Sequence, residues 1–109
     1  MSFRIGSQKN SYVYSDTNMD VNGATVYKCV RGEDEHNNDY KLYLFREHDG
    51  HWQAVEDTNE ATDPVNNGRK IFRTLNPVDN IVTPGWIHWQ WRDETTWAGD
   101  MSFQTSRSQ

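Results

Sequence analysis

The strongest constraint on the fold of this chain is a succession of short β-prone runs separated by turn-forming residues. No window carries apolar residues at helical spacing without an interrupting Gly, Pro or Asn. Asn22-Gly23 and His48-Asp49-Gly50 have the composition of hairpin turns. The expected strands are residues 11–15, 24–30, 40–47, 51–57, 69–75, 86–92 and, at an edge, 101–105. This spacing predicts an all-β fold, a single antiparallel sandwich or small barrel of six to seven strands.

The core of such a fold must be built mainly from aromatic side chains. Leu, Ile, Val and Phe together number only 19 of 109 residues, but the chain has five Trp, five Tyr and four Phe. Each aromatic side chain buries roughly 150–250 Å², so a few of them replace many aliphatic ones. We expect Trp52 and Cys29 inside, and we expect residues 40–47, apolar on both faces, to form a central strand.

Length and charge limit the domain organisation and the partners. Residues 1–109 are expected to form a single β domain, with residues 1–10 and 106–109 frayed. The formal net charge of -5 argues against nucleic acid as a partner, because phosphate binding needs an excess of Lys and Arg. No apolar run is long enough to span a membrane, and no signal peptide is visible. We therefore expect a cytoplasmic protein, or a domain excised from a larger one.

Four of the five Trp residues lie near the C-terminus, in and just after the expected strand 86–92. Strand alternation places Ile87, Trp89 and Trp91 on one face, which is expected to be core. The opposite face carries the candidate ligand-binding residues Trp86, His88, Gln90 and Arg92, joined by Trp97 from the following turn. Flat aromatic rings beside planar polar groups suit a sugar, and Trp and Arg are also frequent in protein interfaces. The competing interpretation is that the indole rings only fill an aliphatic-poor core.

Motifs for metal binding and catalysis are weak. Residues 16–23 alternate oxygen-bearing side chains as a calcium loop does, but Val21 and Tyr27 stand where that loop needs Gly and Glu. The acidic segment 32–39 is read as a solvated loop, although the sequence leaves calcium binding there open. His36, His48, His51 and His88 show no ligand spacing, and no nucleophile elbow or phosphate-binding loop occurs. We expect no cofactor, no metal site, no catalytic residues and no enzyme activity.

Several short strings resemble those of a small Trp-rich β module found in animal and protist multidomain proteins. They are NG-x2-VYK at 22–28, LYLF at 42–45, G-x-W at 50–52 and W-x5-W ahead of an Asp at 91–100. The resemblance implies a compact β module that is used for recognition. Together these observations predict a non-catalytic binding module for a carbohydrate or a protein segment. The alternative is a structural or assembly protein that uses the same aromatic strip as a homo-oligomer or partner interface.

Overall fold

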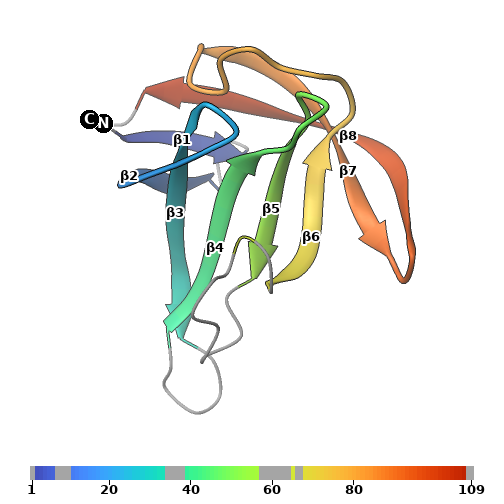
Figure 1. Cartoon of the computed structure of the whole chain (residues 1–109), viewed down its shortest axis with the longest axis horizontal. Coiled ribbons are helices and arrows are strands. Elements are labelled where there is room, and N and C mark those ends of the chain that lie inside the picture. Colours follow the sequence, from blue (N-terminus) through green and yellow to red (C-terminus); the bar gives the residue numbers. More distant parts are fainter. Residues whose placement is uncertain (1, 7–10, 34–38, 57–64, 66–67, 108–109) are drawn as a thin grey trace.

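The chain folds into a closed antiparallel β-barrel in which every strand pairs with its neighbours in sequence and the last strand pairs with the first (Figure 1). The computed structural model describes residues 2–6, 11–33, 39–56, 65 and 68–107. The strands are β1 (Ser2–Gly6), β2 (Ser11–Val21), β3 (Ala24–Glu33), β4 (Asp39–Arg46), β5 (Trp52–Glu56), β6 (Arg69–Thr74), β7 (Gly85–Asp93) and β8 (Thr96–Arg107). The all-β prediction is confirmed, and the described strands number eight, more than the six or seven expected.

The extra strand lies in a segment that we expected to fray. Residues 2–6 form β1, which pairs with β2 and with the C-terminal half of β8. Phe3 and Ile5 alternate with other residues over only five positions. A pattern this short does not distinguish a strand from a frayed terminus in the sequence. It is strand pairing on both sides that orders this segment. β8 likewise begins at Thr96 and reaches Arg107, so it takes in residues 106 and 107, which we also expected to fray, and Trp97, which we expected in a turn.

Local turn chemistry fixes two of the hairpins as predicted. Asn22 and Gly23 both have positive φ, at 53° and 80°, and join β2 to β3 as a two-residue turn. The β4–β5 hairpin closes through a hydrogen bond of 2.7 Å from the Glu47 N–H to the His51 carbonyl, with Gly50 at φ 91°. β2 is longer than the expected strand 11–15 because a bulge at residues 17 and 18 absorbs the polar segment without ending the strand.

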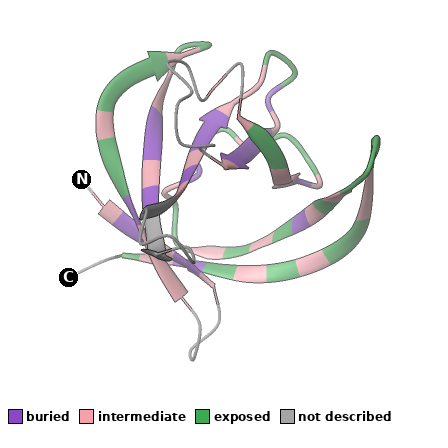
Figure 2. Ribbon diagram, turned by 90° about the horizontal axis from the view of Figure 1, so that it is seen from below, coloured by how far each residue is buried: buried purple, intermediate pink, exposed green. Residues whose placement is uncertain are grey.

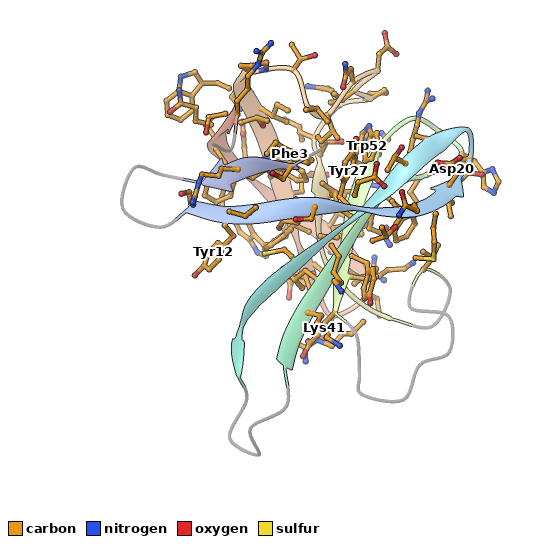
Figure 3. All side chains as sticks on the ribbon, turned by 90° about the vertical axis from the view of Figure 1, so that its left-hand side faces the viewer. Phe3, Tyr12, Asp20, Tyr27, Lys41 and Trp52 are labelled. Carbon is orange, nitrogen blue, oxygen red and sulfur yellow. The ribbon has the colours of Figure 1, made fainter. Side chains whose placement is uncertain are left out.

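Aromatic rings make up much of the barrel interior. Phe3 stacks on Tyr14 and meets the Tyr27 ring edge-on, with ring centroids 4.8 Å apart in the second pair. The ring centroids of Tyr27 and Trp52 lie 6.2 Å apart (Figure 3). Trp52 and Cys29 are buried, as predicted. Large rings thus compensate for the shortage of aliphatic side chains.

β4 is buried on both of its faces, as predicted for this run. Leu42 and Leu44 point into the barrel, whereas Phe45 packs outside it with Val26 and Val55. Val65 packs against this outer cluster. Of residues 57–68, which join β5 to β6, only Val65 and Gly68 are among the described residues.

The connection between β6 and β7, residues 75–84, covers one end of the barrel (Figure 1). Ile81 is fully buried in the interior cluster, and Val78 packs against the same cluster. The indole N–H of Trp52 donates a hydrogen bond of 2.8 Å to the Val78 carbonyl. The apolar residues of this connection make it a lid that completes the core.

The role of β1 can be tested at Phe3, which is fully buried. Phe3→Ala is expected to lower the free energy of unfolding by ~3–5 kcal/mol, because it removes ring contacts and leaves a cavity. The neighbouring Arg4→Ala should cost less than about 1 kcal/mol. Chemical denaturation followed by Trp fluorescence measures both. If Phe3→Ala and Arg4→Ala lowered the free energy of unfolding by equally small amounts, β1 would not be a paired strand of the barrel.

Tyr27 is expected to make stability depend on pH in the alkaline range. Burial, followed by the nearby carboxylate of Asp16, raises the pKa of the Tyr27 phenol above 10.0. The folded protein therefore keeps a proton that the unfolded chain loses, so the free energy of unfolding falls as pH rises above about 10. Denaturation at pH 8 and 11 should show a smaller loss in Tyr27→Phe than in the wild type. An equal loss would show that Tyr27 does not contribute.

Candidate functional site

The predicted binding residues lie on the β7–β8 hairpin, whose tip extends away from the barrel (Figure 2). The two strands pair from Gly85–Thr105 to Asp93–Thr96. β1 contacts only the C-terminal part of β8, and β6 pairs only with Trp89–Trp91 of β7. Much of the hairpin's outer face is therefore exposed.

The base of the hairpin carries an open group of side chains that we call the open patch: Trp86, His88, Asp100, Ser102 and Gln104. Trp86 is opposite Gln104 and His88 is opposite Ser102 in the strand register. All five residues are exposed, and Trp86 exposes 67% of its surface. In the strand register the indole lies opposite an amide, and an imidazole, a hydroxyl and a carboxylate follow along the same two strands.

His88 is held in one orientation by its neighbours on β8. Its Nδ1 lies 2.7 Å from Asp100 Oδ1 and 3.2 Å from Ser102 Oγ. A carboxylate can only accept a hydrogen bond, so the proton of the neutral ring resides on Nδ1. Nε2 of the neutral ring is then an acceptor for a ligand hydroxyl. The patch consequently offers acceptors as well as donors around the indole ring.

The other predicted residues form a paired cluster further along the hairpin, consisting of Arg73, Gln90, Arg92 and Trp97. Arg73 Nε donates to Gln90 Oε1 at 3.2 Å. The guanidinium carbons of Arg73 and Arg92 lie 5.0 and 5.2 Å from the centroid of the Trp97 ring. These side chains already interact with one another, so a ligand would have to compete with those contacts. The structure thus places Trp86 and His88 in one group and Gln90, Arg92 and Trp97 in another.

The face of β7 that we expected to be core carries Ile87, Trp89 and Trp91, and one of these three residues is exposed. Trp89 is buried and Ile87 packs against the interior, but Trp91 exposes 41% of its surface. Trp91 lies where the hairpin leaves the barrel, and the register shifts there because β8 carries an extra residue. Its ring packs directly against Gly99, where a Cβ would overlap it. Strand alternation indicates the face correctly but cannot show that the pairing of β7 with β6 ends at residue 91.

Metal ligands are not grouped in the described part of the chain. No set of three His, Cys, Asp or Glu side chains there could hold an ion. Asp16 Oδ1 accepts a hydrogen bond from the Asn18 N–H in the β2 bulge, so one carboxylate of the oxygen-rich segment 16–23 has a structural role. Residues 34–38 of the acidic segment 32–39 lie outside the described residues.

Comparison with family models, with curated proteins and with solved structures found no match. No helix among the described residues is long and apolar enough to cross a membrane. The case for function therefore depends on the geometry of the site.

Sequence reasoning missed four members of the two groups: Arg73, Asp100, Ser102 and Gln104. Alternation along residues 101–105 does place Ser102 and Gln104 on one face. Nothing local, however, gives the register that sets them opposite Trp86 and His88. Arg73 comes from β6, which pairs with β7 across the long connection 75–84.

The contact between Trp91 and Gly99 can be tested against a matched glycine. Gly99 and Gly23 have φ of 77° and 80°, but a Cβ on Gly23 meets nothing within 4 Å. Gly23→Ala should cost about 1–2 kcal/mol from backbone strain alone. Gly99→Ala should cost about 1 kcal/mol more, because the Trp91 ring must move. Urea denaturation measures the difference, and adding Trp91→Ala should abolish it. A difference that survives this second substitution would refute the contact.

Proposed function

We propose that this protein is a non-catalytic binding domain that recognises a carbohydrate through the open patch. The observation that carries the proposal is the exposure of Trp86, at 67%, among oriented polar groups. A large exposed ring is costly to leave in water and is a frequent anchor of binding sites. The paired cluster would flank the ligand with Arg92 and Gln90.

The chemistry of the open patch favours a sugar over other small ligands. A pyranose ring has C–H groups on its face, which pack against an indole, and hydroxyls around its rim, which need both donors and acceptors. Ser102 and Gln104 provide both, whereas Asp100 and the His88 ring provide acceptors. The patch has no concentration of cations that would select a phosphate or a nucleic acid. Stacking with planar hydrogen bonds gives affinity without any reaction.

A protein interface is the second candidate, and the same exposed ring supports it. Trp86 and, further along the hairpin, the Arg92–Trp97 pair are residue types that are enriched at interface centres. In that case the patch would cover a protein segment or a second copy of the chain. The two candidates differ in whether Trp86 remains exposed in the purified protein.

A glycan panel distinguishes the candidates. Titration of the purified chain with neutral and acidic oligosaccharides is expected to shift Trp fluorescence for at least one sugar class. Trp86→Ala should weaken that binding about tenfold or more, and Trp86→Phe should weaken it less because a ring remains. Met19→Ala is the control, since Met19 is exposed on β2 away from the hairpin.

Two results would count against the carbohydrate proposal. One is the absence of a response to every glycan in the panel. The other is a concentration-dependent dimer, measured by light scattering, that Trp86→Ala converts to a monomer. The second result would instead support the interface candidate.

A further inference from the structure

A groove separates the first half of β6 from the outer half of the β7–β8 hairpin. β6 pairs with β7 only over residues 72–74. Among the described strands, Arg69 and Lys70 pair with β5 alone. Beyond Trp91 the hairpin continues to its tip, away from the barrel (Figure 2). Where the two strands diverge, they leave a groove of about 560 Å³ that is open to solvent.

Half of the side chains that line the groove are apolar. They are Ile71, Phe72, Trp91 and Met101. Trp91 exposes 41% of its surface, and the other three side chains are half-buried, so all four retain surface that a ligand can cover. The indole and the phenyl ring are flat, and the thioether of a methionine adapts to the shape of what it contacts. This part of the lining suits the flat apolar body of a small molecule.

The other half of the lining is charged, and its balance is positive. Arg69, Lys70 and Arg92 provide three cations, and Glu94 provides one carboxylate. The chain as a whole has a formal net charge of -5, so the groove is a local exception to the charge of the protein. A concave site with one sign of charge in excess concentrates ions of the opposite sign. The groove therefore favours an anion.

The three cations remain able to bind a ligand. Lys70 is exposed and forms no ion pair with another described residue. Arg69 Nε lies 3.5 Å from Glu56 Oε2, but the Arg69 side chain is 72% exposed, and such pairs are weak enough to rearrange. The Arg92 guanidinium carbon lies 5.2 Å from the centroid of the Trp97 ring, a contact that holds the cation without neutralising it.

A second hollow in the barrel lacks this charge. The pocket beside Trp89, of about 330 Å³ and partly open to solvent, has Tyr12 and Phe103 among its lining residues. No charged side chain occurs in its described lining. An anion would lose hydration there without gaining a partner, so this pocket would favour a neutral molecule. A preference for the charged form of a probe therefore identifies the groove.

We infer that the groove binds a small aromatic carboxylate. The flat body of the ligand packs against Trp91 and Phe72, and its carboxylate accepts hydrogen bonds from Lys70 and the arginine side chains. An arginine can donate two parallel N–H bonds to one carboxylate. The volume of the groove lies within the range of small-molecule sites, about 300–1,000 Å³. The groove lining shares no residue with the open patch, so this inference does not depend on carbohydrate recognition.

Two probes of nearly equal shape test the selection of an anion. Naphthalene-2-acetate carries a carboxylate where naphthalene-2-acetamide carries a neutral amide. Calorimetric titration of the full chain should show the acetate bound about three- to tenfold more tightly than the amide. Lys70→Glu should abolish this preference. Lys28→Glu is the matched control, because it changes the net charge equally on β3, which contributes no residue to the described lining, and it should keep the preference.

Variants at aromatic positions locate the binding. Trp91→Ala should weaken both probes about fivefold or more, with far-ultraviolet circular dichroism confirming that the chain still folds. Phe103→Trp, in the pocket beside Trp89, and Trp86→Ala, in the open patch, should leave both affinities unchanged. If Trp91→Ala does not fold, the comparison of Lys70→Glu with Lys28→Glu decides alone, since both changes are made at side chains outside the buried core.

Three results would overturn the inference. The first is that naphthalene-2-acetate does not bind the wild-type chain, or binds no more tightly than the amide. The second is that Lys70→Glu and Lys28→Glu reduce the preference equally, which would show that only the overall charge of the protein matters. The third is that Phe103→Trp or Trp86→Ala weakens the acetate whereas a folded Trp91→Ala does not, which would place the probe outside the groove.

Discussion

The pairing of β1 with β8 is the interaction on which the rest of the structure depends. It joins the two ends of the chain and closes the sheet, so that no strand keeps an open edge along the barrel wall. Closure also creates an inside and an outside from strands that otherwise have two equivalent faces. The interior cluster, the pocket beside Trp89 and the exposed hairpin face all follow from that single separation.

Aromatic rings make up much of the interior cluster of the barrel. The Tyr27 ring contacts both Phe3 and Trp52, and Ile81 of the lid is buried in the same cluster. Large flat rings fill volume efficiently, but they cannot follow every contour of a barrel that has few aliphatic side chains. The packing leaves a pocket of about 330 Å³, partly open to solvent, with Trp89 and Phe103 among its lining residues.

The β7–β8 hairpin shows how one strand can serve two environments. Residues of one face enter the barrel, whereas Trp86 and His88 face solvent and meet polar partners on β8. Beyond Trp91 there is no barrel left to cover the inward face, so this ring packs on Gly99 instead. The open patch therefore lies on the outer side of the strand whose inner side carries the buried Trp89.

The sequence by itself determined the all-β class, the turns at Asn22-Gly23 and Asp49-Gly50, the buried positions of Trp52 and Cys29, and the face on which Trp86 and His88 lie. These follow from local properties, namely turn preferences and the two-residue period of a strand. Only the tertiary structure decided that the sheet closes, that residues 2–6 are a strand, and that Asp100 and Ser102 join His88. It also decided that Trp91 is exposed and that a pocket adjoins Trp89. Each of these depends on strand register and on pairing between distant segments, and a local sequence pattern does not specify which strand another strand pairs with.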